Sequence, residues 1–149
     1  MREACSDDPE VHMELATHGA THQGLVRPGN EDSFLCGERV LAVADGLGGH
    51  VAGEVASALA LEPLAALDGR AAGCAEVVAA LPQAVQEGNA AVLADAEAHP
   101  ERHGMGTTLT AAVVCEGAAH LAHVGDSRAY LTRPDEGRRQ LTPDHTPVA

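Results

Sequence analysis

Apolar and polar residues alternate in the first part of the chain, in the pattern of half-buried β-strands. The alternation over residues 31–36 and 39–44 predicts two strands, and the turn residues at 37–38 predict that they form a hairpin. Residues 12–20 alternate in the same way and predict an earlier strand. Because antiparallel neighbours lie close together, the hairpin would bring its first residues near Asp45, which follows the second strand.

The period then changes to that of an amphipathic helix. Apolar residues spaced about four apart predict a helix over residues 51–69. The alanine-rich segment 71–98 predicts a second helix, in which Pro82 is a candidate break because proline has no backbone N–H.

Alternation returns in the last third of the chain. Residues 107–115, 118–124, 128–132 and 139–142 predict four more strands, with a turn at 134–137. The order of strands, two helices and further strands predicts an α+β domain, in which the helices cover one face of a largely antiparallel sheet.

Composition narrows the class of protein. A length of 149 residues suits one domain, and residues 1–12, which have mixed charge and no period, are expected to be a disordered lead-in. A net charge of −13 argues against nucleic-acid binding, and an aromatic content of 1% provides no stacking platform for bases. The sequence has no apolar run of the roughly 20 residues that a membrane span needs, and its first residues do not resemble a signal peptide. We therefore expect a cytoplasmic protein with no membrane partner.

The four cysteines are far apart in the sequence, at Cys5, Cys36, Cys74 and Cys115. They form no C-x-x-C pair, so neither a zinc site nor a disulfide framework is expected. We expect reduced and mostly buried thiols.

Candidate chemistry is concentrated in the segments 27–32 and 40–50. Asp45 stands at the end of an apolar strand, where a carboxylate is held rigidly, and Mg²⁺ and Mn²⁺ prefer such oxygen ligands. The carbonyl of Gly46 is open to a close approach because glycine has no Cβ. Arg27 lies close by in the sequence, and a guanidinium matches the oxygens of a phosphate group. Taken singly, Asp45 would be read as a turn or capping aspartate and Arg27 as a surface residue. The metal reading is preferred because Asp45 occurs together with Glu31 and Arg27.

At these residues the chain resembles the metal-dependent serine/threonine protein phosphatases of the PPM (PP2C) family, bacterial branch. The resemblance rests on ordered blocks at Gly24–Asp32, Asp45–His50, Gly104–Thr108, Val124–Leu131 and, more weakly, Leu141–His145. It implies a β-sandwich flanked by helices, of which residues 13–149 would form the N-terminal part.

The resemblance also implies a metal site with two Mn²⁺ or Mg²⁺ ions. In this reading Asp45 bridges the two ions, and Glu31 and the Gly46 carbonyl bind one of them. Asp126 corresponds to an aspartate that takes part in a third metal site in bacterial relatives. A structural role for Asp126 in a tight Gly125–Ser127 turn remains an equal alternative.

Catalytic roles follow from the same resemblance. Arg27 would bind the substrate phosphate, Asp32 would orient metal-bound water, and Asp45 would complete the catalytic set. The implied reaction is hydrolysis of phosphoserine and phosphothreonine in proteins by an activated water, in opposition to a serine/threonine kinase. His50 is expected to be structural, because Leu47 occupies the position at which some relatives carry a histidine acid.

The chain departs from the family at its end. Later Asp-Gly and Asp-Asn motifs, which complete the two-metal site in the family, have no counterpart before Ala149. We therefore expect a truncated phosphatase, inactive or very weak in isolation and prone to aggregation. The alternative is a non-catalytic phosphoprotein-binding or regulatory remnant of the same fold.

Overall fold

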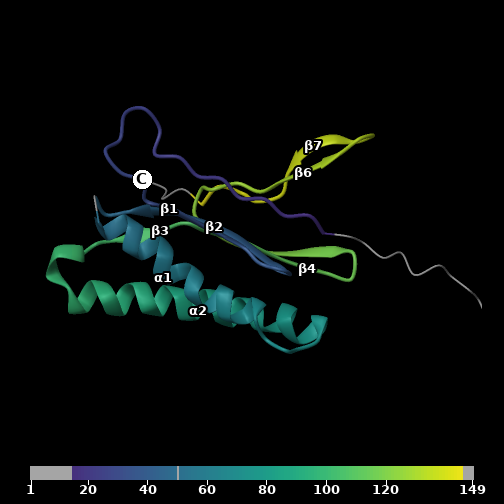
Figure 1. The fold of residues 1–149 in the computed structure, drawn as a ribbon, viewed down its shortest axis with the longest axis horizontal. Coiled ribbons are helices and arrows are strands. Elements are labelled where there is room, and N and C mark those ends of the chain that lie inside the picture. The colour runs from purple at the N-terminus through teal and green to yellow at the C-terminus, as the bar shows by residue number, and fades with distance from the viewer. Residues whose placement is uncertain (1–14, 50, 146–149) are drawn as a thin grey trace, which may run out of the picture.

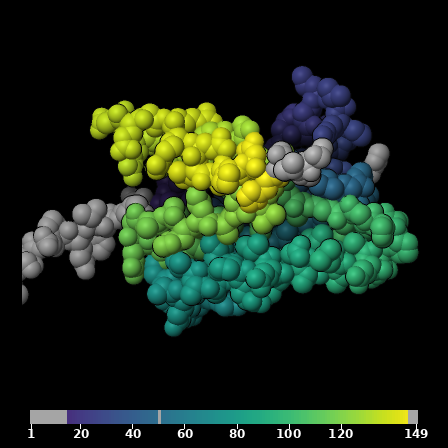
Figure 2. Space-filling model, turned by 180° about the vertical axis from the view of Figure 1, so that it is seen from behind, coloured from purple at the N-terminus to yellow at the C-terminus, as the bar shows by residue number. Residues whose placement is uncertain are grey.

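The buried residues of the main sheet face one side, where two long helices cover them. The computed structural model describes residues 15–49 and 51–145. In Figure 1 the helices lie beneath a five-stranded sheet, and an irregular N-terminal segment and a small hairpin lie above it. The space-filling view from behind shows the same three layers, with that hairpin and the N-terminal segment as separate lobes above the sheet (Figure 2).

The order of elements follows the predicted order of strands, two helices and further strands. The helices are α1 (Val51–Asp68), α2 (Cys74–Ala98) and a short 3₁₀ helix η1 (Pro100–Arg102). The strands are β1 (Asp32–Cys36), β2 (Val40–Leu47), β3 (Gly106–Thr107), β4 (Leu109–Cys115), β5 (Ala118–Val124), β6 (Tyr130–Arg133) and β7 (Gly137–Gln140). The main sheet has the order β1-β2-β4-β5 with β3 also paired to β2, and β6 and β7 form a separate two-stranded sheet.

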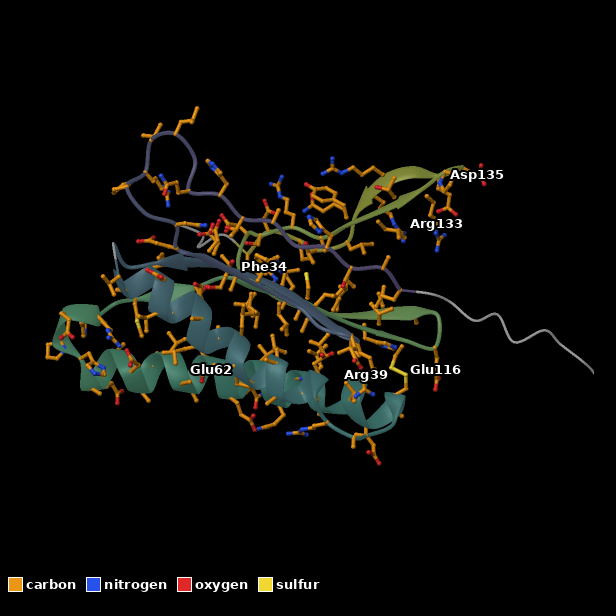
Figure 3. All side chains as sticks on the ribbon, in the orientation of Figure 1. Phe34, Arg39, Glu62, Glu116, Arg133 and Asp135 are labelled. Atoms are coloured by element: carbon orange, nitrogen blue, oxygen red, sulfur yellow. A yellow bond between two sulfur atoms is a disulfide. The ribbon has the colours of Figure 1, made fainter. Side chains whose placement is uncertain are left out.

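The predicted hairpin is confirmed as the antiparallel pair β1–β2. Its register places Phe34 opposite Val43 and Asp32 opposite Asp45. Since successive side chains in a strand point to opposite faces, Val40, whose side chain is fully buried, faces the helices while Val43 faces away. Figure 3 shows Phe34 on the face opposite the helices. The two aspartates therefore share the open face of the sheet.

The core lies between the sheet and the helices and is built from small and aliphatic side chains. Its buried members include Val40, Leu64, Leu67, Val77 and Val113, each at most 1% exposed. With so few aromatic residues, the core depends on close backbone approach. A Cβ at Gly88 of α2 would lie 2.7 Å from the carbonyl oxygen of Ala60 in α1, so glycine permits the two helices to touch.

Asp68, at the end of α1, anchors the turn of the β1–β2 hairpin to the helix layer. Its carboxylate accepts backbone N–H bonds from Glu38 (3.0 Å), Arg39 (2.8 Å) and Val40 (2.8 Å). Burial by itself would raise the pKa of Asp68, but these N–H bonds outweigh it and hold that pKa below its ordinary value. A lowered pKa in the folded state means that Asp68 stabilises the fold at neutral pH, and that this contribution is lost as the pH falls through it.

Replacing Asp68 by alanine is expected to lower the free energy of unfolding by about 2–3 kcal/mol, because three N–H groups lose a charged acceptor. Glu62→Ala, on an exposed position of the same helix, is the matched control and should change it by less than about 0.5 kcal/mol. Urea unfolding monitored by circular dichroism at pH 7 and at pH 3.5 measures both variants. The difference between Asp68→Ala and wild type should shrink at the lower pH; equal stability of the two proteins at pH 7 would contradict the anchoring role.

Several predicted boundaries are wrong. Residues 15–20 form no strand, so within the described part of segment 12–20 that prediction fails. Strand β2 runs on to Leu47, because Gly46 and Leu47 pair with β3. The alternating segment 107–115 is divided at Thr108. Helix α2 continues through Pro82, whose side chain is exposed on the outer side of the helix. The last two strands are each displaced by about two residues from their predicted positions.

The cysteine prediction is also wrong. Cys74 and Cys115 form a disulfide with their Cα atoms 5.8 Å apart, although 41 residues separate them in sequence. The reason is tertiary: the first residue of α2 packs against the last residue of β4, near Arg39 and Glu116 in Figure 3. Cys36 is a free and exposed thiol rather than a buried one, and Cys5 lies outside the described residues.

No helix within residues 15–49 or 51–145 is both long enough and apolar enough to cross a membrane.

Candidate active site

The hairpin register sets the geometry of the candidate site. Asp32 and Asp45 are directly paired on neighbouring strands, and the N–H of Gly46 donates to the carbonyl oxygen of Glu31 at 3.1 Å. Just upstream, Asn30 accepts the N–H of Asp32 (3.1 Å) through its side-chain oxygen. These two bonds fix the angle at which the loop that carries Arg27, the predicted phosphate-binding residue, joins β1 beside the carboxylates.

Two glycines allow Glu31 to approach the start of α1. A Cβ at Gly46 would lie 2.0 Å from the carbonyl oxygen of Gly53, and a Cβ at Gly53 would lie 2.9 Å from Oε2 of Glu31. The first approach is to a backbone atom, so position 46 requires glycine, whereas a side chain at position 53 would push the Glu31 carboxylate away. The Glu31 carboxylate consequently packs against the first turn of α1, where the unpaired N–H groups of the helix favour negative charge.

Four of the six predicted site residues line one cavity. This cavity of about 240 Å³ is lined by His22, Gln23, Arg27, Gly29, Asn30, Glu31, Asp32 and Asp45. A neighbouring cavity of about 330 Å³ shares His22, Asp32 and Asp45 and is also lined by Ser127. The structure thus brings Arg27 together with the three carboxylates, while Gly46 is buried behind them in β2.

Asp45 is under electrostatic strain in the metal-free protein. Its partial burial raises its pKa, and the negative charge of Asp32 and a hydrogen bond shared with that carboxyl group raise it further. Asp126 adds to the rise, and only Arg27 acts against it. Like charges gathered with one guanidinium favour the approach of a cation.

Asp126 lies in the tight turn that the sequence predicted. Gly125 has a φ of +104°, a left-handed conformation that glycine adopts without strain. The turn is held by Ser127, whose hydroxyl is 2.7 Å from the hydroxyl of Thr108. Asp126 is near enough to influence the pKa of Asp45, so the turn geometry and a metal role are compatible at this position.

Sequence reasoning missed the importance of Thr108, since threonine in an alternating segment is an ordinary strand residue. Its signal, visible only in the structure, is that it lies between β3 and β4, which both pair with β2, and directly precedes the buried strand β4. Arg128 forms an ion pair with Asp144, in which Nε donates to the carboxylate at 2.8 Å, so its role is structural. His123 is hydrogen-bonded on both ring nitrogens, to Thr110 and to the Pro143 carbonyl, as expected of a structural histidine.

Two further histidines bear on the site. His22 accepts the N–H of Gly24 at 2.9 Å through Nδ1 and lines both cavities. His50, predicted to be structural, lies outside the described residues.

The donor chemistry of the site fits a hard divalent cation. The carboxylates of Glu31, Asp32 and Asp45 supply oxygen ligands of the kind that Mn²⁺ and Mg²⁺ prefer. Across the part of the chain that the structure describes, no three acidic, histidine or cysteine side chains are already arranged as a closed metal site. Burial first, and repulsion by Asp32 second, raise the pKa of Asp45, and a bound cation would offset that repulsion.

Comparison with known proteins agrees with this geometry. Residues 13–149 match the family model described as "Protein phosphatase 2C". The serine/threonine protein phosphatase PstP of Mycobacterium tuberculosis is 50% identical over 136 residues, which cover 91% of this chain and 26% of that protein. The serine/threonine phosphatase stp of Listeria monocytogenes is 40% identical over 136 residues, covering 86% of this chain and 54% of that protein.

A solved structure is similar over the same region. It is the catalytic domain of the serine/threonine protein phosphatase PstP in complex with two manganese ions, and it superposes with a TM-score of 0.77 at 50% identity. The match covers 83% of this chain and 53% of that domain. The chain therefore spans about half of the catalytic domain it matches.

Proposed function

The chain belongs to the protein phosphatase 2C family, and from this premise we propose that it carries the N-terminal half of the active site of a metal-dependent phosphoserine/phosphothreonine protein phosphatase. The observation that carries the proposal is the cavity in which Arg27 lies with Glu31, Asp32 and Asp45. A guanidinium among carboxylates suits a site that must hold a cation and a phosphate group side by side.

Each residue has a distinct task in this proposal. Asp45, Glu31 and the Gly46 carbonyl would hold Mn²⁺ or Mg²⁺, and Asp126 would take part in binding a further ion. When bound, two such ions supply a hydroxide near neutral pH and neutralise charge on the phosphate. Asp32 would orient a water in the cavity through its carboxylate. No covalent protein nucleophile is needed, since phosphoryl transfer asks mainly for positioning and charge stabilisation.

Arg27 would clamp the phosphate of the substrate. Its loop is exposed, with Leu25 fully exposed and Val26 94% exposed beside it, so a bulky phosphoprotein can reach the guanidinium. Substrates would be phosphorylated proteins, with a serine/threonine kinase as the opposing enzyme. The apolar pair Leu25 and Val26 offers contact area next to the phosphate subsite.

The residues that complete a two-metal site in the family would come from chain beyond the matched half. We propose that residues 13–149 bind at most one ion tightly, and that two tight ions require the remainder of the domain. A non-catalytic phosphoprotein-binding module is the second candidate, favoured by the exposed loop of Leu25 and Val26 that carries Arg27.

The test joins this chain to the part of the M. tuberculosis catalytic domain that the match leaves uncovered. Hydrolysis of a phosphothreonine peptide by this chimera should require Mn²⁺, and Arg27→Ala should lower kcat/KM about 100-fold by removing the phosphate clamp. Arg70→Ala, an exposed arginine at the end of α1, is the matched control and should leave kcat/KM unchanged. Peptide binding without turnover would favour the module, and equal effects of the two arginine variants would remove Arg27 from the proposal.

A further inference from the structure

Thr108 joins the two segments that carry the aspartates of the site. It lies between β3 and β4, is only 9% exposed, and belongs to neither strand. It lies beside Asp45, since Thr107 is paired with Gly46 and Thr110 with Val43 on β2. None of its atoms lines the cavity that contains the candidate ligands.

Thr108 forms hydrogen bonds with both backbone polar groups of Asp45. The N–H of Asp45 donates to Oγ1 of Thr108 at 3.0 Å, and the N–H of Thr108 donates to the carbonyl oxygen of Asp45 at 2.9 Å. The hydroxyl of Thr107 adds a second donor to the same carbonyl, at 3.0 Å. The peptide groups on both sides of the Asp45 Cα are therefore fixed, and with them the direction of its Cα–Cβ bond.

Toward Asp126, the contacts of Thr108 hold the turn. Its hydroxyl is 2.7 Å from the hydroxyl of Ser127, the residue after Asp126. On the other side of Asp126, a Cβ at Gly125 would lie 2.7 Å from Cγ2 of Thr108, so the turn rests directly on the threonine methyl. The two flanking residues of Asp126 thus both contact one side chain.

We propose that Thr108 is a positioning residue that fixes the separation of Asp45 and Asp126, and thereby the shape of the cation site. This inference rests on the proposed function. The hydroxyl has one proton and two lone pairs, so it can accept from Asp45 and at the same time bond to Ser127. Valine has the same shape as threonine but can make neither bond, whereas serine can make both.

The experiment measures Mn²⁺ binding to the 149-residue chain by isothermal titration calorimetry, without reference to turnover. Thr108→Val is expected to weaken Mn²⁺ binding about 10-fold, the effect typical of lost support behind a metal ligand, and Thr108→Ser should stay within about threefold of wild type. Should Thr108→Val fail to fold, Thr108→Ala removes the same hydroxyl without a branched side chain and carries the same expectation.

Thr142→Val is the matched control. Thr142 is 4% exposed, and its hydroxyl accepts one backbone N–H, from Ala129 at 3.0 Å, so valine removes a comparable bond away from Asp45. Both valine variants should lower the melting temperature, but only Thr108→Val should weaken Mn²⁺ binding. Equal Mn²⁺ affinity in Thr108→Val and wild type, or equal weakening in Thr142→Val, would overturn the inference.

A second measurement separates this inference from the proposed function. If wild type and Asp45→Asn bind Mn²⁺ equally, or neither binds it, the proposal that this site binds a metal ion is wrong. Amide hydrogen exchange then decides on Thr108 alone: the Asp45 amide should exchange at least about 10-fold faster in Thr108→Val than in Thr142→Val. An unchanged rate at Asp45 would overturn the positioning role in either case.

Discussion

Replacing Asp45 by asparagine is expected to weaken Mn²⁺ binding more than about 100-fold and, in the absence of metal, to raise the melting temperature of the chain. Loss of a metal ligand should weaken Mn²⁺ binding by more than the 10- to 100-fold that is typical when a residue supporting a ligand is lost. The gain in stability follows from the raised pKa of Asp45, which reflects burial first and the neighbouring Asp32 second. A neutral amide avoids both the desolvation and the repulsion.

The stability difference between Asp45→Asn and wild type should depend on pH because the pKa of Asp45 is raised. Because the pKa of Asp45 is higher in the folded chain than in the unfolded chain, the folded chain binds the proton more tightly. The ionised carboxylate therefore destabilises the metal-free fold at neutral pH, and this penalty disappears as the pH falls through the raised pKa. The stability advantage of Asp45→Asn should accordingly be largest near pH 7 and vanish in acid.

Thermal unfolding with and without MnCl₂, together with calorimetric titration of Mn²⁺, measures these effects. Mn²⁺ should raise the melting temperature of wild type but not of Asp45→Asn, since a ligand stabilises only a state that it binds. Asp135→Asn, an exposed aspartate in the turn of the small hairpin, makes the same chemical change away from the site and serves as control (Figure 3). A variant at Asp45 with wild-type Mn²⁺ affinity would exclude this residue as a ligand.

The second large effect is expected at Gly46, where alanine should lower the free energy of unfolding by about 3–5 kcal/mol. Its Cβ would lie 2.0 Å from the carbonyl oxygen of Gly53 and 2.7 Å from that of Glu31. Both are backbone atoms, so no side chain can rotate away to relieve the overlap. Helix α1 must then move away from β2, which also displaces the Glu31 carboxylate.

Gly73→Ala is the matched control, because a Cβ at Gly73 has no neighbour within 4 Å in the described structure. Gly73 caps α2, and exchanging glycine for alanine at a helix N-cap should lower stability by no more than about 1 kcal/mol. Urea unfolding of both variants by circular dichroism gives the comparison. If Gly46→Ala unfolds at the same urea concentration as Gly73→Ala, the close approach of α1 to β2 is not required by the fold.

Local patterning predicted the elements because each pattern is a periodicity of the backbone itself. The alternation around Phe34 and Val43 is the two-residue period of a strand, and the spacing of apolar residues after residue 51 is the period of a helix. Once the hairpin was recognised, its antiparallel pairing was sufficient to place Asp32 near Asp45. Where a boundary depended on a distant partner the prediction failed, as for the end of β2, which β3 extends to Leu47.

The sequence also predicted only part of the candidate site. Residue types identified Arg27 and Asp45 as candidates, the resemblance to the phosphatase family added Glu31, and all three line one cavity. The raised pKa of Asp45 was not predictable because it depends on burial, and the contact of Glu31 with the first turn of α1 was not predictable because it depends on where the helix packs.

What the sequence determined by itself is therefore the set of secondary elements, the antiparallel hairpin and the residues with candidate metal and phosphate chemistry. Only the tertiary structure decided that Cys74 meets Cys115, that Gly46 meets Gly53, and that Thr108 connects Asp45 with the Asp126 turn. These contacts join residues from 7 to 63 positions apart in pairs whose spacing has no period. Local propensity cannot specify such contacts, because they arise from the packing of whole elements against one another.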